Sequence, residues 1–179
     1  MKKLLQLKLY CQSVNMIKKL NISILTMFGV GKSNYAPGTV ASFVTCLIYI
    51  CFYVFQINIF TLLIFTILLF IFSTYSIDWC KNSFKEIDAK EIVIDEFIGQ
   101  SVPILTIYNF VEKNNLSHFI VYTFLSFVLF RIFDILKPYP INKIDKELKN
   151  GFGVILDDVV AGVCSAIVLL TIIFFINYA

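Results

Sequence analysis

An uncharged apolar run from position 40 to position 77 limits what this chain can fold into more than any other feature. None of its 38 residues is Asp, Glu, Lys, Arg or His. A single helix of that length, rising ~1.5 Å per residue, would extend far beyond the ~30 Å hydrocarbon core of a bilayer. The polar residues within 56–58 predict a tight turn. The run is therefore expected to form two membrane helices.

The overall composition agrees with a membrane protein. Hydrophobic residues make up 59% of the chain and charged residues 15%, with a mean hydropathy of +0.83. These values exclude an ordinary water-soluble domain and a disordered segment. A nucleic-acid partner is not expected, because the chain has no strongly basic face. Membrane lipids are the expected surroundings.

Further apolar segments at 97–111, 118–136 and 159–178 alternate with polar segments at 78–96 and 137–158. We predict an all-α, polytopic membrane helix bundle with about five transmembrane helices. Residues 1–28 are expected to be a basic interfacial segment, because lysines divide them into stretches too short to span a bilayer. A secretory signal peptide fits them less well. Residues 29–179 are expected to form a single membrane-embedded domain.

The segment 97–111 is short for a crossing, and the distribution of positive charge favours one. If it crosses, 14 of the 15 basic residues share one side of the membrane and only Lys113 lies opposite. The positive-inside rule then makes the first side cytoplasmic and places His118 on the other side. The alternative, a re-entrant or interfacial segment, loses this asymmetry.

Neither the cysteines nor the Gly-Lys-Ser sequence at 31–33 predicts a functional site. The five cysteines are scattered and mostly lie in apolar stretches, so they are expected to be core residues and not ligands of zinc or members of a disulfide framework. The Gly-Lys-Ser at 31–33 lacks the glycine that a nucleotide-binding loop needs five positions before Gly31, since position 26 is Thr26.

Acidic residues at the borders of apolar segments are the strongest indication of chemistry. Asp95 and Glu96 form one pair, and Asp157 and Asp158 form another. Carboxylates are costly near a membrane, and without histidine or thiolate companions they suit Mg²⁺ or Mn²⁺. The alternative is that they are headgroup-level charges paired with lysines. Small residues four positions later, Gly99 and Gly162, predict a close helix approach that would bring the two pairs together.

A third cluster has its charges three residues apart. Arg131, Asp134 and Lys137 share one stripe of a helix that Pro138 ends. A guanidinium and an ammonium beside acids are suited to binding a phosphate group. The alternative is an internal salt bridge between Arg131 and Asp134, with Lys137 reaching to the headgroups.

Taken together, these motifs resemble the phosphatidylglycerophosphatase A family, bacterial inner-membrane lipid phosphatases. The resemblance covers Gly29 to about Ser165 and departs from the family pattern at Ala41 and Asn150, where glycines are expected. The motifs that carry it are Pro37-Gly38-Thr39 with Ser42, Ile94 to Gly99, Phe130 to Ile141, and Gly151 to Gly162.

The resemblance implies Mg²⁺-dependent hydrolysis of phosphatidylglycerophosphate to phosphatidylglycerol and phosphate, in phospholipid biosynthesis, at the cytoplasmic face of the bacterial inner membrane. A small cation-coupled transporter or channel subunit is the alternative. The expected catalytic residues are Asp95, Glu96, Asp134 and Asp158, the expected Mg²⁺ ligands are Asp95, Glu96, Asp157 and Asp158, and the expected substrate-binding residues are Arg131, Lys137, Thr39 and Ser42. Asp134 is expected either to orient the attacking water or to act as the nucleophile.

Overall fold

A computed structural model describes residues 2–84, 89–111 and 115–178, and these residues are helical with short connections. The predicted all-α class is therefore confirmed. The helices are α1 (Lys2–Leu25), η1 (Met27–Lys32), α2 (Pro37–Val54), α3 (Ile59–Cys80), η2 (Lys81–Ser83), α4 (Ile94–Tyr108), α5 (Leu116–Leu136), α6 (Ile141–Glu147) and α7 (Gly151–Tyr178), where η marks a 3₁₀ helix.

Four helices, α2, α3, α5 and α7, are long and apolar enough to cross a membrane. The first two confirm that the uncharged run forms a pair of helices joined by a short turn. Asn58 begins α3, and its side-chain oxygen accepts a hydrogen bond from the backbone N–H of Phe60 at 2.8 Å. One side of α3 exposes large apolar residues such as Ile64 and Ile71, as a lipid-facing helix does.

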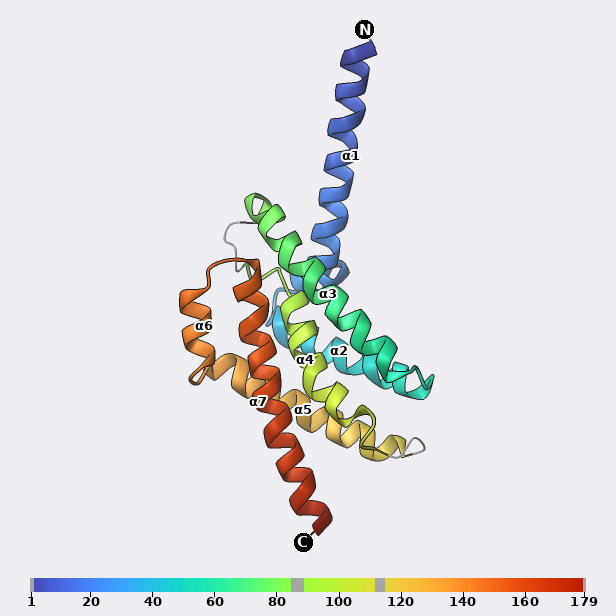
Figure 1. The fold of residues 1–179 in the computed structure, drawn as a ribbon, viewed down its shortest axis with the longest axis vertical. Helices are drawn as coiled ribbons and strands as arrows, with labels where there is room; N and C mark the ends of the chain where they lie inside the picture. Colours follow the sequence, from blue (N-terminus) through green and yellow to red (C-terminus); the bar gives the residue numbers. More distant parts are fainter. Residues whose placement is uncertain (1, 85–88, 112–114, 179) are drawn as a thin grey trace.

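The shorter helix α4 runs through the middle of the bundle, between α2, α3, α5 and α7 (Figure 1). Its 15 residues span ~22 Å and are almost all buried. Its first turns pack against α7, and at its last residue the Tyr108 hydroxyl donates a hydrogen bond to the carbonyl of Ile57, in the turn between α2 and α3, at 3.0 Å. With α4, five of the described helices run through the bundle, and four of them are long enough to cross a membrane, which is roughly consistent with the predicted number of about five transmembrane helices.

Helix α1 projects away from the bundle, and the two termini lie at opposite extremes of the molecule (Figure 1). The carbonyl of its last residue, Leu25, accepts a hydrogen bond from the N–H of Val93, which ties it to the segment that precedes α4. The sequence predicted a surface segment over 1–28. The structure forms a continuous helix over most of that range.

Several helices begin earlier than the hydropathy pattern predicted, and α4 and α7 are the two that matter for the site. Helix α4 starts at Ile94 instead of position 97, and α7 starts at Gly151 instead of position 159. The start of α7 is fixed by capping, because the Asp78 carboxylate accepts from the N–H of Gly151 at 2.9 Å and the Asn150 side chain accepts from the N–H of Gly153 at 2.8 Å. Asn150, a departure from the family pattern, thus serves as a helix cap.

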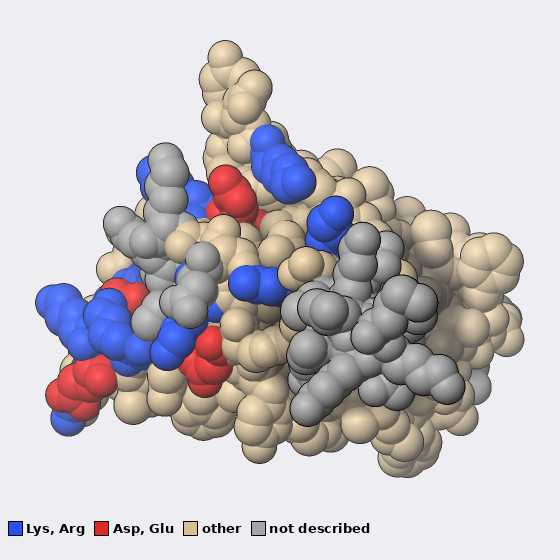
Figure 2. Space-filling model, turned by 90° about the horizontal axis from the view of Figure 1, so that it is seen from above, with Lys and Arg blue, Asp and Glu red and all other residues tan. Residues whose placement is uncertain are grey.

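Charged side chains gather on one part of the surface when the molecule is viewed from the end that carries α1, and another part of that view is uncharged (Figure 2). Lys113, the one basic residue predicted for the opposite side, lies outside the described residues. Three of the cysteines, Cys46, Cys80 and Cys164, are free and buried or half-buried within apolar helices, as predicted. Cys51 is free and exposed.

Candidate active site

Three carboxylates meet where α4 and α7 begin. Asp95 and Glu96 lie in the first turn of α4, and Asp158 lies about two turns into α7. Each contributes one oxygen to a group in which all the oxygens lie within 4.8 Å of one another. Asp95 and Asp158 are buried, with 7% and 5% of their surface exposed. The structure thus brings together three of the four predicted metal ligands.

A close helix crossing makes this meeting possible. A Cβ atom placed on Gly99 would lie 2.6 Å from the backbone carbonyl oxygen of Asp158, and one placed on Gly162 would overlap the carbonyl oxygen of Gly99. The predicted close approach of α4 and α7 at these glycines is confirmed. Pro103 contributes too, because it has no N–H to donate to the Gly99 carbonyl one turn earlier. That carbonyl therefore faces Gly162 without its usual partner in the helix.

Helix α5 adds Arg131 and Asp134 at the edge of the acid group. The Arg131 guanidinium pairs with the Asp134 carboxylate at 2.5 Å, so the predicted internal salt bridge is present. Asp134 also lies in hydrogen-bond contact with Asp158, and Arg131 lies within electrostatic reach of Glu96. The salt bridge therefore belongs to the acid group and is not a separate feature of the helix surface.

The first turn of α2 closes another side of the site. Gly38 packs directly against the Glu96 carboxylate, and a Cβ atom at this position would lie 3.3 Å from the Arg131 guanidinium. Thr39 follows and is half-buried. Ser42 is fully buried, and its hydroxyl donates to the Gly38 carbonyl at 2.9 Å. Substrate binding by Thr39 and Ser42 stays a prediction.

Lys137 lies between two carboxylates at the end of α5. Its ammonium is 2.6 Å from Asp157 and 3.1 Å from Asp145 of α6. Partial burial acts to lower the pKa of Lys137, but the two carboxylates outweigh it and raise the pKa above its ordinary value. Asp157 was predicted to bind the metal, but the structure leaves it out of the three-carboxylate group and pairs it with Lys137.

The three grouped acids suit a Mg²⁺ ion. Oxygen ligands at ~2.1 Å from Mg²⁺ lie ~3.0 Å apart when adjacent in an octahedron and ~4.2 Å apart when opposite, so shifts of about 1 Å or less would bring these carboxylates to binding distance. One oxygen of Glu96 is buried and has no hydrogen-bond partner among the described residues. Like charges this close repel one another, and a divalent cation would neutralise them. Asp95, Glu96 and Asp158 therefore fit the donor set that Mg²⁺ prefers.

Exposure increases outward from these acids. The side chains of Asp134 and Arg131 are 13% and 16% exposed, and that of Lys137 is 29% exposed. A phosphate group arriving from the surface would meet Lys137 and Arg131 before it reached the acids. His118, by contrast, lies at the start of α5, far along the chain from this end of the helix.

The sequence did not single out three residues that shape the site. Asp145 sits among the lysines of 143–149 and resembles an ordinary surface acid until the fold places it beside Lys137. Gly38 belongs to a recognised motif, but its contact with Glu96 depends on tertiary packing. Asp78 ends an apolar run, which gave no indication that it caps α7, 73 residues later.

The known proteins that are similar to this chain all carry the names of lipid phosphatases. The family model described as phosphatidylglycerophosphatase A matches residues 23–173. A protein of Bacteroides thetaiotaomicron, provisionally named a phosphatidylinositol-3-phosphatase, is 36% identical over 84% of this chain and 91% of its own. The Escherichia coli phosphatidylglycerophosphatase A is 30% identical over 78% of this chain and 75% of its own length. The Haemophilus influenzae phosphatidylglycerophosphatase A is 40% identical over 48% of this chain and 47% of its own length.

No solved structure matches the chain. The family model nevertheless covers all the residues that build the site, from Gly38 on α2 to Gly162 on α7. Several apolar helices long enough to cross a membrane accompany that match, as expected of a multi-pass membrane enzyme. The chain belongs to the phosphatidylglycerophosphatase A family of phosphatases.

Proposed function

We propose that this protein hydrolyses phosphatidylglycerophosphate to phosphatidylglycerol and inorganic phosphate, and that the reaction requires Mg²⁺. The observation that carries the proposal is the group formed by Asp95, Glu96 and Asp158, with Arg131 beside it. Acids alone would repel a phosphate dianion. A bound divalent cation would reverse that effect, polarise the phosphoryl group and lower the pKa of a water molecule.

The chain's own residues divide the remaining tasks. Hydrolysis joins a water oxygen to phosphorus and breaks the bond between phosphorus and the lipid glycerol oxygen. It needs a group that accepts a proton from the water and returns it to the leaving glycerol oxygen, which becomes the hydroxyl of phosphatidylglycerol. We assign the acceptor role to Asp134, because it contacts Asp158 on one side and Arg131 on the other. Arg131 and Lys137 would hold the negative oxygens of the phosphate. A nucleophilic Asp134 is the competing assignment.

Orientation in the membrane is part of the proposal. The basic residues of the chain, Lys113 apart, lie in segments assigned to one side, which the positive-inside rule makes cytoplasmic. The site would then open to the cytoplasmic face of the bacterial inner membrane, where it would serve phospholipid synthesis. The distribution of acids argues against the transporter alternative, because Asp95, Glu96 and Asp158 gather where α4 and α7 begin and do not line a path through the membrane.

A direct assay tests the proposal. The purified full-length protein in detergent is given phosphatidylglycerophosphate, and released phosphate is measured after EDTA treatment and again after addition of Mg²⁺. We expect activity to disappear with EDTA and to return with Mg²⁺. Full activity in the metal-depleted protein would overturn the metal-dependent reaction.

A second substrate belongs in the same assay. Because the relative from Bacteroides thetaiotaomicron carries the name of a phosphatidylinositol-3-phosphatase, phosphatidylinositol 3-phosphate is the natural competitor. We expect kcat/KM to be higher for phosphatidylglycerophosphate. A higher kcat/KM for phosphatidylinositol 3-phosphate would make the inositol lipid the preferred substrate and would leave the proposed metal site unaffected.

A further inference from the structure

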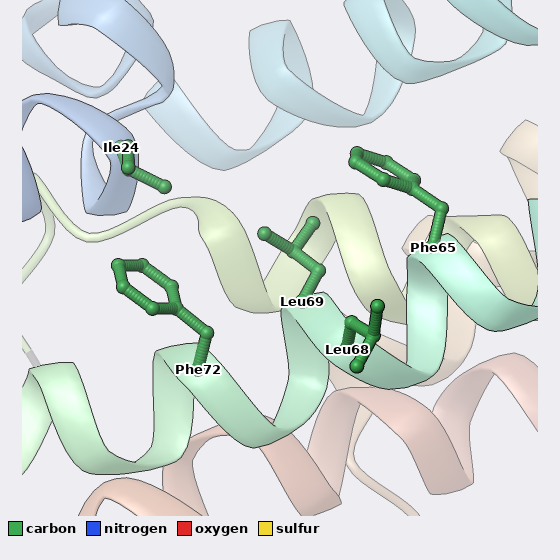
Figure 3. Close-up of a pocket in the computed structure, with 5 residues that line it drawn as sticks. All are labelled: Ile24, Phe65, Leu68, Leu69 and Phe72. Atoms are coloured by element: carbon green, nitrogen blue, oxygen red, sulfur yellow. The ribbon is translucent and has the colours of Figure 1, made fainter.

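A shallow apolar groove runs along the outside of α3, beneath the end of α1. Ile24 of α1 forms one wall, and four residues of α3 form the other: Phe65, Leu68, Leu69 and Phe72. Figure 3 shows Ile24 lying across the groove from Leu69 and Phe72. None of these side chains belongs to the carboxylate group, so the catalytic residues do not explain the groove.

The face of α3 that carries the groove continues to the membrane interface. Tyr75 and Trp79 lie three and seven residues after Phe72, on the same side of the helix. They are 74% and 48% exposed. Exposed Tyr and Trp at a helix end are typical of the headgroup level of a bilayer. At ~1.5 Å per residue, Phe72 lies ~10 Å and Phe65 ~21 Å along the helix from Trp79, which is the depth range of the acyl chains of one leaflet.

Positive charge lies at the same level as the two aromatic residues. Lys18 of α1 lies within electrostatic reach of Cys80, the last residue of α3. Lys19 is adjacent and exposed. The chain has no acidic residue before Asp78, and the Asp78 carboxylate is turned toward α7, where it accepts from the N–H of Gly151. Lys18 therefore brings a positive charge near the end of α3, Lys19 adds a second exposed one beside it, and α1 carries no acid to neutralise them.

We propose that the cleft between α1 and α3 is a binding site for an anionic phospholipid of the surrounding leaflet. One acyl chain would lie in the groove between Ile24 and Phe72, and Lys18 and Lys19 would bind the negatively charged headgroup. The two lysines precede residue 23, where the match to the family model begins, whereas the residues that line the groove lie within it. The inference does not depend on the proposed reaction.

The chain carries its own probe for this site. Trp79 is the single tryptophan, and it lies on the groove face of α3, two turns beyond Phe72. The full-length protein in phosphatidylcholine bilayers would receive a small fraction of phospholipid with dibrominated acyl chains, bearing either a phosphatidylglycerol or a phosphatidylcholine headgroup. Bromine quenches indole fluorescence at short range, so quenching of Trp79 reports which lipid occupies the groove.

We expect the brominated phosphatidylglycerol to quench Trp79 at a lower mole fraction than the brominated phosphatidylcholine. In the variant K18E/K19E this preference should fall by about 30-fold or vanish, since each lysine near a membrane surface contributes roughly fivefold to the binding of anionic lipid. The variant K18Q/K19Q should lose most of it without reversing the charge. The matched control K146E/K149E changes two exposed lysines near α6 and should keep the preference.

Two results would overturn the lipid site. One is equal quenching by the two headgroups in the unchanged protein, which would mean that the groove meets only bulk lipid. The other is a preference that persists in both K18 and K19 variants while their far-UV circular dichroism remains that of the unchanged protein. Because fluorescence needs no turnover, neither result bears on the phosphatase reaction.

Discussion

The ammonium of Lys137 lies 2.6 Å from the carboxylate of Asp157, although the two residues are 20 positions apart and come from different helices. This contact joins the end of α5 to α7 beside the three-carboxylate group. It gives Asp157 a partner in the cation that would bind the phosphate, while metal binding by Asp157 stays a prediction. Carboxylates that would bind the metal and carboxylates that hold Lys137 should therefore respond differently to substitution.

Asp95→Asn and Asp158→Asn should each lower kcat by at least about 100-fold, because each removes a carboxylate from the proposed Mg²⁺ ligand set. Phosphate release at increasing Mg²⁺ concentrations measures the effect, and higher Mg²⁺ should restore part of the activity. Glu91→Gln, an exposed acid just before α4, is the matched control and should leave kcat unchanged. Near wild-type turnover in a well-folded Asp95→Asn variant would show that Asp95 is not a ligand.

Asp145→Asn should raise KM by about two- to fivefold and leave kcat nearly unchanged, because the carboxylate holds Lys137 from a partly exposed position and such pairs contribute modestly. Steady-state kinetics separate the two constants. Asp145→Glu should recover most of the lost affinity, and Glu147→Gln on the same helix should have no effect. A fall in kcat without any change in KM would contradict a positioning role for Asp145.

Gly162→Ala should destabilise the protein by about 1–3 kcal/mol, because the added methyl group would overlap the carbonyl of Gly99 and push α4 away from α7. Activity should fall together with stability, since the same crossing brings Asp158 to Asp95. Thermal unfolding in detergent and phosphate release measure both. The adjacent Val163→Ala, at a lipid-exposed position, is the control. If Gly162→Ala unfolds at the normal temperature, the helices do not cross as closely as described.

A reporter enzyme fused after Tyr178 should be active in the periplasm, and one inserted within residues 143–150 should be active in the cytoplasm. The reason is the concentration of basic residues on one side of the membrane in the predicted topology of five crossings. The measurement uses two reporter enzymes, one active only in the periplasm and the other active only in the cytoplasm, and compares their activities at each position. A periplasmic signal from the 143–150 insertion would reverse the proposed orientation of the site.

The parts of the site that could be predicted from the sequence are those governed by helical spacing. Gly99 and Gly162 each follow an acid by four residues, so the position of the small residue beneath each carboxylate follows from the geometry of one helix. Asp95 and Asp158 then come together if the face of α4 that carries Gly99 packs against the face of α7 that carries Gly162. The structure confirms that they do.

The parts that could not be predicted depend on how the chain turns between helices. Lys137 adopts a positive φ of 42° and Pro138 follows it, so the chain leaves α5 abruptly and returns through α6. Only this turn places Asp145 beside Lys137. The start of α7 was missed for a related reason, because hydropathy ends the polar segment at Asp158, whereas the cap from distant Asp78 starts the helix two turns earlier.

The dependence of the site on α7 has a consequence for the order of synthesis. Asp95 and Glu96 of α4 leave the ribosome long before Asp158, and without α7 they have neither the third carboxylate nor the glycine against which α4 packs. A nascent chain that has inserted every helix but α7 would hold two acids at the membrane and no complete metal site. On the proposed reaction, the protein would be inactive toward the lipids around it while it is being made, and its activity would begin only when α7 enters the bilayer.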